Sequence, residues 1–305
     1  QDLLMVKPTI WINTPLLLEK LISRINKELS GLKGIKKLAT RILPKFIINN
    51  KIKKQLGLEE LRLLVSGGAS LPEWVFDGFR ELGITIIEGY GLSEASPIIS
   101  ANPVNKAKRG SVGMVIESDE VEIRDRDDEN NGEIVVKGSN VMHGYYKNPE
   151  ATDEVLSSDG WLRTGDIGYF DEDGYLYITG RKKSVIVTAG GKNIFPEEIE
   201  EKLTKLPIVE EALVFSPDDK EIQAIIYPNI EEYCYQSGDK NEDIKNTNLY
   251  NIINQKIKDL NKELEPYKRV SKFAIKKDEF PKTTTRKIKR FLFKDIDLNN
   301  TETYL

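Results

Sequence analysis

The sequence contains very little of the chemistry that depends on sulfur or imidazole. It has one cysteine, Cys234, and one histidine, His143, in 305 residues. A single cysteine cannot close an internal disulfide, and a zinc site or a triad built on histidine would have no partners. No apolar run approaches the roughly 18 residues that span a bilayer, and no secretory-signal pattern opens the sequence. We therefore expect a cytoplasmic protein and assign no role to His143 or Cys234.

The sequence also lacks a large excess of charge of either sign. Lysine and arginine total 45 and aspartate and glutamate total 49, which gives a net charge of −4. Such a balance does not favour nucleic-acid binding. The length favours two domains of about 150 residues each. Residues 2–9 read like the end of a helix entering a buried strand, so we expect a piece of a longer protein.

One basic stretch interrupts this balance. Residues 16–29 and 31–54 both carry helical spacing, and 31–54 has eight basic residues and no acidic one. The expected apolar stripe of the second helix consists of Leu32, Ile35, Leu38, Ile42 and Phe46. A basic amphipathic helix can lie on an anionic membrane surface. The alternative, which we favour, is a solvated face above a core stripe.

Short apolar runs alternate with glycine turns in the next segment. Residues 61–66 form such a run, a Gly-rich turn follows at 67–72, and residues 72–82 have helical character. A second β-branched run, 84–87, ends at 88–91. Strands alternating with a helix predict a parallel sheet, which binds ligands beyond the carboxyl ends of its strands. Both glycine turns fall at those ends.

After residue 111 the pattern changes to hairpins. Alternating residues on both sides of an acidic turn predict a hairpin over 121–136, and a second hairpin surrounds the turn at 171–174. The aspartates of that turn are expected to form the turn, because the spacing of a calcium loop is missing.

A smaller unit is expected after residue 180. Its predicted strands are 185–187, 212–215 and 224–227, with a helix starting near Pro196. A polar loop is expected over 236–247, then a helix over 248–263, and a basic tail over 281–294.

Six motifs occur in a fixed order along the chain. They are SGGASLP at 66–72, GYGLSE at 89–94, GWLRTGD at 160–166, GRKK at 180–183, GGKN at 190–193 with PEEIE at 196–200, and PKTTTRKIKR at 281–290. The glycine turns fit neither the P-loop nor the dinucleotide fingerprint. In this order the motifs resemble those of the adenylate-forming (AMP-binding) enzymes, most closely the bacterial long-chain fatty-acid–CoA ligases.

The resemblance implies an α/β fold and a two-step reaction. Residues 1–180 would be the second half of a large AMP-binding domain, and 181–305 a small mobile α+β domain with its hinge near Lys183. Such enzymes join a fatty acid to the α-phosphate of ATP with Mg²⁺, release pyrophosphate, and then transfer the acyl group to CoA. This chemistry depends on positioning and charge neutralisation more than on a covalent catalyst.

The resemblance also assigns the nucleotide site. Gly68 and Ala69 would line the adenine, although a plain tight turn is the alternative. Tyr90 would belong to the nucleotide floor, although packing is its alternative role. The residues of this floor are Glu88, Gly89, Tyr90 and Gly91.

The phosphate and ribose positions follow in the same way. Ser93 would contact phosphate, and Glu94 would bind Mg²⁺, although a carboxylate favoured by a helix N-terminus is the alternative. Asp166 would accept the ribose hydroxyls, and Arg181 would support the ribose or phosphate.

Three residues of the small domain complete the assignment. Lys287 would stabilise the charge that develops as the adenylate forms, although one more cation in a basic tail is the alternative. Lys183 would be the hinge, and Gly191 would enter the site for the thioester step.

The sequence departs from the family at two places. Arg286 precedes Lys287 where most of the family has glycine, and no Ser/Thr/Gly-rich phosphate loop is present. Two alternatives to the CoA ligase therefore stay open: a ligase that loads an acyl carrier protein, and an inactive fragment that binds a nucleotide or a partner. A nucleic-acid-binding module is a distant third.

Overall fold

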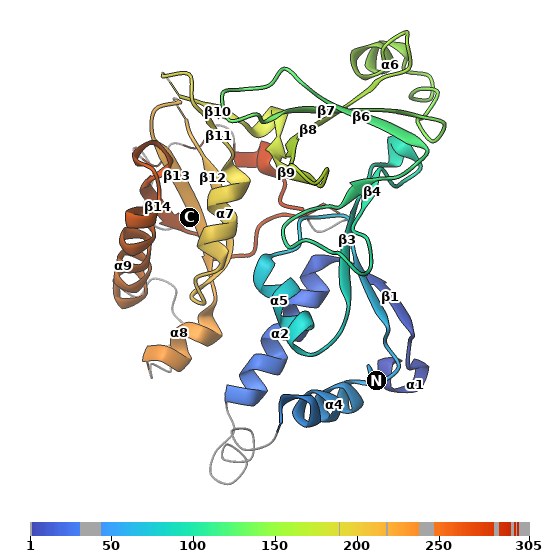
Figure 1. Cartoon of the computed structure of the whole chain (residues 1–305). Helices are drawn as coiled ribbons and strands as arrows, with labels where there is room; N and C mark the ends of the chain where they lie inside the picture. Colours follow the sequence, from blue (N-terminus) through green and yellow to red (C-terminus); the bar gives the residue numbers. More distant parts are fainter. Residues whose placement is uncertain are drawn as a thin grey trace. The chain divides into compact units, whose positions relative to one another are not determined.

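The computed structural model describes residues 2–30, 44–188, 190–217, 219–237, 247–283, 287–293, 296 and 298. The chain divides into two compact units, residues 1–178 and 179–305. The sequence placed the boundary after residue 180. Figure 1 shows the helices and strands of both units, and each unit is described by itself below.

The N-terminal unit contains a five-stranded sheet in the order β1-β2-β3-β4-β5. The first three strands are parallel, which confirms the pairing predicted for 61–66 and 84–87, and β4 and β5 are antiparallel to their neighbours. The turn expected to begin at residue 88 is wrong at its start, because β3 continues to Tyr90. The strands are β1 (Ile10–Asn13), β2 (Leu63–Ser66), β3 (Ile86–Tyr90), β4 (Ser100–Ala101) and β5 (Met114–Val115). The helices of this unit are α1 (Asp2–Val6), α2 (Pro15–Ser30), α4 (Lys45–Leu56), α5 (Glu73–Glu81), the 3-10 helix η1 (Ser93–Ala95) and α6 (Pro149–Val155).

Helices α2 and α5 pack on one face of the parallel strands. Leu64 of β2 and Ile86 of β3 are fully buried there against Ile22 of α2 and Phe79 of α5. Burial of this apolar surface is what folds the unit, because alternate strand residues and one helix stripe meet. The expectation of a buried strand after residues 2–9 is wrong, because β1 leaves Ile10 59% and Ile12 73% exposed and presents these apolar side chains to solvent.

The prediction of one helix over 31–54 is wrong. Pro44 is extended (φ −56°, ψ 137°), and α4 begins after it. The proline ring blocks a helix from continuing through this position. Phe46, expected in the buried stripe, is 64% exposed. The other stripe residues, Leu32, Ile35, Leu38 and Ile42, and Lys33, Lys36, Lys37 and Arg41 lie outside the described residues.

A second, four-stranded sheet follows in the order β6-β7-β8-β9 and confirms both predicted hairpins. Its strands are β6 (Asp119–Arg124), β7 (Gly132–Gly138), β8 (Leu162–Phe170) and β9 (Leu176–Arg181), the last of which continues into the C-terminal unit. Asp171 forms its turn as expected, because its Oδ1 accepts from the backbone N–H groups of Asp173 and Tyr175 at 3.0 and 2.9 Å. In the described part of the chain, no cluster of three or more His, Cys, Asp or Glu is arranged to hold a metal.

The C-terminal unit contains the three-stranded sheet β12-β13-β14, with β12 and β13 antiparallel and β13 and β14 parallel. The strands of that sheet are β12 (Val209–Phe215), β13 (Ile222–Pro228) and β14 (Val270–Ile275). Two short strands of the same unit, β10 (Ile186–Val187) and β11 (Asn193–Ile194), form a separate antiparallel pair. The helices of the C-terminal unit are the 3-10 helix η2 (Lys182–Ser184), α7 (Pro196–Thr204), α8 (Ile230–Ser237), α9 (Thr247–Glu263), and the 3-10 helices η3 (Pro266–Lys268) and η4 (Arg290–Phe293). The loop expected from residue 236 is wrong at its start, because residues 236 and 237 end α8.

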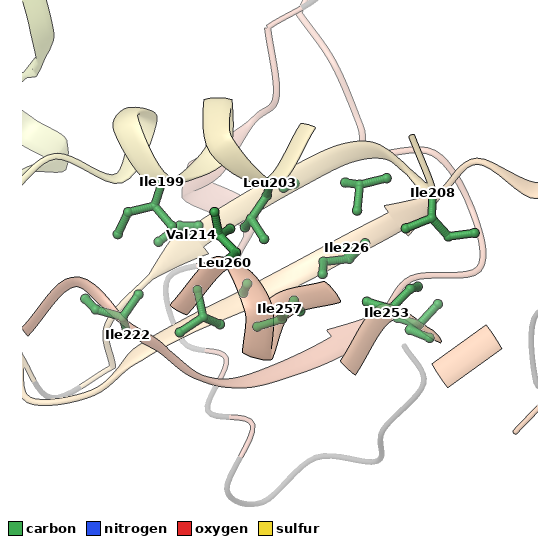
Figure 2. Packing of buried hydrophobic residues seen from close by; sticks show 14 of the residues in the cluster. Ile199, Leu203, Ile208, Val214, Ile222, Ile226, Ile253, Ile257 and Leu260 are labelled. Carbon is green, nitrogen blue, oxygen red and sulfur yellow. The ribbon is translucent and has the colours of Figure 1, made fainter. Parts of the chain in front are cut away.

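The two faces of this sheet bury different segments. Figure 2 shows Ile199 and Leu203 of α7 and Ile257 of α9 packed with Val214 and Ile226 on one face. The alternate residues Leu213 and Ile225 belong to a second core with Phe280 and Phe293 from the C-terminal segment. Because side chains alternate along a strand, the C-terminal segment packs on the face opposite α7 and α9.

Candidate active site

The turn after β2 is fixed by a buried carboxylate from β3. Glu88 is 5% exposed, and its Oε1 accepts a hydrogen bond from the backbone N–H of Leu71 at 3.0 Å. This bond ties the end of the SGGASLP turn to the neighbouring strand. Gly68 and Ala69 lie in the turn with their surfaces exposed. Gly68 has φ +86°, a conformation that favours glycine.

Tyr90 and Asp166 form the most clearly defined contact among the predicted site residues. The Tyr90 hydroxyl donates to Asp166 Oδ2 at 2.7 Å, and the two residues are 8% and 5% exposed. They lie 76 residues apart, on β3 and β8. The structure therefore joins the GYGLSE and GWLRTGD motifs directly. Sequence reasoning assigned Tyr90 to packing or the nucleotide floor and missed this bond, because no local pattern encodes it.

The aspartate lies inside a strand and is held at its backbone. Residues 164–166 are part of β8, although Gly165 has φ +70°. The Thr164 hydroxyl donates to the Ile134 carbonyl at 2.7 Å and accepts from the Asp166 N–H at 3.1 Å. The threonine thus fixes the backbone that carries the carboxylate, which gives Asp166 a defined direction.

The segment after β3 approaches another backbone too closely for a side chain. A Cβ on Gly91 would lie 1.6 Å from the Pro97 carbonyl oxygen, whereas a Cβ on Gly89 would meet nothing nearer than 3.5 Å. Gly91 is thus the sterically required glycine of this motif. Ser93 and Glu94 follow in η1, with Ser93 exposed and Glu94 half-buried.

Tyr145 is a contact of the site that sequence reasoning missed. Its hydroxyl donates to Glu94 Oε1 at 2.9 Å. Burial and the Glu94 carboxylate raise the pKa of the Tyr145 phenol, so it remains a donor at neutral pH. Met142 N–H also donates to the Glu94 carbonyl at 2.8 Å. The 51 residues between Glu94 and Tyr145 leave no spacing signal for this pair.

The remaining predicted residues lie in the C-terminal unit. Arg181 ends β9, Lys183 lies in η2, and both are exposed. Gly191 lies in the turn between β10 and β11 with φ +75°. A Cβ there would meet no atom within 4 Å, so its conformation, and not crowding, favours glycine. Its N–H donates to the Thr188 carbonyl at 2.8 Å.

The two described sides of the Lys287 loop, residues 281–283 and 287–289, are hydrogen-bonded to each other. An isolated antiparallel bridge joins Lys282 and Ile288. Thr283 N–H donates to the Lys287 carbonyl at 2.8 Å, and Lys287 N–H donates to the Thr283 hydroxyl at 3.1 Å. The Lys287 side chain is exposed. Arg286, the departure from the family pattern, lies outside the described residues.

Two family models match the chain. The model described as AMP-binding enzyme matches residues 1–146, and that described as AMP-binding enzyme C-terminal domain matches residues 183–295. Together they account for most of the sequence and contain four of the six motifs, those at 66–72, 89–94, 190–200 and 281–290.

Similar proteins carry related descriptions. A long-chain-fatty-acid–CoA ligase from Mycobacterium bovis is 42% identical over 180 residues, 59% of this chain and 29% of that protein. A chloroplastic long-chain-fatty-acid–[acyl-carrier-protein] ligase from Arabidopsis thaliana is 36% identical over 207 residues, 63% of this chain and 28% of that protein.

A solved structure covers more of the fold. The O-succinylbenzoate coenzyme A synthetase from Bacillus subtilis, in complex with ATP and magnesium ion, has a TM-score of 0.68 and 27% identity. The similarity covers 95% of this chain and 52% of that one, so the chain spans about half the length of this relative. From its fold, its motifs and these matches, the chain belongs to the AMP-binding enzyme family.

Proposed function

We propose that the protein to which this chain belongs activates a long-chain fatty acid with ATP and transfers the acyl group to CoA. The observation that carries this proposal is the Tyr90–Asp166 hydrogen bond, which joins two motifs of the family in one nearly buried place. The similarity to long-chain-fatty-acid–CoA ligases supports the substrate class.

The residues of the N-terminal unit fit a nucleotide and a magnesium ion. In the proposal, the exposed turn at Gly68 and Ala69 accepts the adenine, and the Asp166 carboxylate accepts ribose hydroxyls while Tyr90 holds it in place. Glu94 offers a hard oxygen ligand of the kind that Mg²⁺ prefers, and Tyr145 orients it. Bound Mg²⁺ would neutralise charge on the phosphates. Glu88, Gly89, Gly91 and Ser93 shape the remaining floor.

The C-terminal unit supplies the groups proposed to act at the reacting phosphate. Lys287 is exposed and lies next to the bridge between Lys282 and Ile288. In the proposal its ammonium group neutralises charge on the α-phosphate as the mixed anhydride forms. Arg181 supports the ribose or phosphate. Backbone rotation at Lys183 is proposed to bring Gly191 to the site for thioester formation with CoA.

The acceptor defines the second candidate function. The 36% identity to a long-chain-fatty-acid–[acyl-carrier-protein] ligase favours a carrier protein as the alternative to CoA. The test is pyrophosphate release by the complete gene product with palmitate, followed by mass analysis of the product with CoA or with an acyl carrier protein. Stimulation by palmitate together with palmitoyl-CoA supports the first function. No stimulation would support the inactive, nucleotide-binding alternative.

Peripheral membrane contact through residues 31–54 is a separate prediction. In the described part of this stretch, α4 carries Lys45, Lys51, Lys53 and Lys54. No helix among the described residues is long and apolar enough to cross a bilayer. Co-sedimentation with anionic liposomes tests the contact, and binding that survives replacement of Lys33, Lys36 and Lys37 would contradict it.

A further inference from the structure

In the C-terminal unit, the ion pair between Glu200 and Arg290 contacts the backbone of one residue of an edge strand. Val214 lies on β12, the first strand of its sheet. Its N–H donates to Glu200 Oε1 at 2.6 Å, and its carbonyl accepts from Arg290 Nη1 at 3.4 Å. Arg290 Nη2 pairs with Glu200 Oε2, and Glu197 Oε1 lies 3.7 Å from the same nitrogen. The side chains of Glu200 and Arg290 thus hydrogen-bond the N–H and carbonyl of Val214 and also pair with each other.

The two partners come from opposite faces of the sheet. Glu200 belongs to α7, which packs through Ile199 and Leu203 on the Val214 face. Arg290 begins η4, whose Phe293 belongs to the core on the Leu213 face. The ion pair therefore fastens the C-terminal segment to α7 around the edge of β12.

Lys287 stands three residues before Arg290, on a loop held at both of its ends. At the first end, Lys282 pairs with Glu211 of β12. At the second end, Arg290 pairs with Glu200, and Lys289 N–H donates to the Pro281 carbonyl at 2.9 Å. Arg290 also donates to the Val214 carbonyl, so the described ends of the loop, residues 281–283 and 287–290, are both held against β12.

The Glu200 carboxylate is nearly buried where it meets Arg290. The Glu200 side chain is 14% exposed. Burial raises the pKa of Glu200 to about 7, and the Arg290 charge opposes that rise while Glu197 adds to it. A buried ion pair contributes little net stability, but removing one partner leaves the other uncompensated. Such a pair is better suited to fixing a geometry than to holding the unit together.

We propose that Arg290 and Glu200 are positioning residues that hold the Lys287 loop in its place on the β12 edge. The link to the adenylation step rests on the proposed function, whereas the structural link does not. Neither side chain needs to touch the substrate, because each acts through the loop.

The structural arm of the test is amide hydrogen exchange on the full chain at pH 8, where Glu200 is ionised. In Arg290→Gln we expect the amides of Thr283, Lys287 and Lys289 to exchange at least about tenfold faster. Amides of α9 should keep their wild-type rates. Arg290→Lys keeps the charge and should show an intermediate effect. Unchanged exchange of the loop amides in Arg290→Gln would overturn the proposal.

Two further variants keep the test decisive. Lys268→Gln is the matched control, because Lys268 pairs at 2.9 Å with Glu198 of α7, the helix that carries Glu200, and also with Glu265. It should leave loop exchange unchanged. If Arg290→Gln also exposes α9, Glu200→Gln decides, because its amide oxygen still accepts from Val214. Faster loop exchange there supports the proposal, and equal exchange contradicts it.

The catalytic arm is a double-mutant cycle on acyl-adenylate formation. Arg290→Gln should lower kcat on the order of tenfold to a hundredfold with little change in KM for ATP. Added to Lys287→Ala, it should cost almost nothing more, because the loop then has no lysine to position. Full additivity would overturn positioning through Lys287. A wild-type protein without adenylation would overturn the proposed function and leave the exchange result standing.

Discussion

At the scale of single residues, the Tyr90 hydroxyl gives a nearly buried carboxylate a fixed donor. A hydrogen bond to a charged group is typically worth about 2 kcal/mol when its donor is removed. Tyr90→Phe should therefore lower the free energy of unfolding by about that amount and weaken AMP binding. Tyr169→Phe, whose ring stacks on Tyr177 at 5.1 Å, is the control. Calorimetric titration with AMP checks both variants, and equal affinity in wild type and Tyr90→Phe would contradict the role of the pair.

Glu200 makes a residue-level prediction about pH. Its pKa rises from 4.5 in water to about 7 in the folded chain because of burial, with Glu197 adding and Arg290 opposing. Between pH 4.5 and 7, the Glu200 carboxyl is therefore protonated in the folded state and ionised in the unfolded state. Relative to Glu200→Gln, the wild-type free energy of unfolding should fall as pH rises from 4.5 to 7, by at most about 3 kcal/mol.

Urea unfolding of both proteins across this pH range measures the difference. Parallel stability curves for wild type and Glu200→Gln would show that the carboxyl titrates normally. A difference that increases with pH would also contradict the account, because it would require a lowered pKa.

At the scale of elements, local pattern predicted what neighbouring residues determine. Short apolar runs between glycine turns predicted the parallel strands β2 and β3, and alternation around turn residues predicted both hairpins. The helix over 31–54 failed because Pro44 outweighs a continuous 3.6-residue period. Helix α8 was not predicted, because the sequence of this short helix does not show that Tyr233 would be buried; in the structure Tyr233 is 1% exposed. The contacts of Asp166 with Tyr90 and of Glu94 with Tyr145 join distant segments, so only the fold reveals them.

The exit of the chain from β3 gives a prediction at this scale. A Cβ on Gly91 collides with the Pro97 carbonyl, whereas a Cβ on Gly68 meets no atom within 4 Å and only strains a positive φ. Gly68→Ala should cost about 1–2 kcal/mol of unfolding free energy, because it forces a left-handed residue. Gly91→Ala should cost clearly more, because backbone must move. Thermal unfolding compares them, and an equal or smaller cost for Gly91→Ala would contradict the close approach.

At the scale of the whole molecule, β1 is an edge strand of the 305-residue chain with exposed apolar side chains. It stands first in its sheet, and Ile10 and Ile12 are 59% and 73% exposed. An apolar edge strand promotes association between chains. We expect the isolated chain to self-associate in sedimentation velocity, and Ile10→Lys with Ile12→Lys to reduce that association without changing far-UV circular dichroism. Monomeric wild-type chain at micromolar concentration would contradict this expectation.

The central claim is that this chain carries the lysine and the nucleotide-binding residues of an adenylation reaction. The most direct measurement is single-turnover formation of acyl-adenylate from labelled ATP and palmitate by the complete gene product. We predict that Lys287→Ala slows this step by about 10²-fold or more, the usual effect of removing one charge-stabilising donor. Lys289→Ala, two positions along the same basic segment, should stay within about twofold, as expected for a group outside the reaction. No acyl-adenylate in the wild type, or equal rates for the two variants, would contradict the claim.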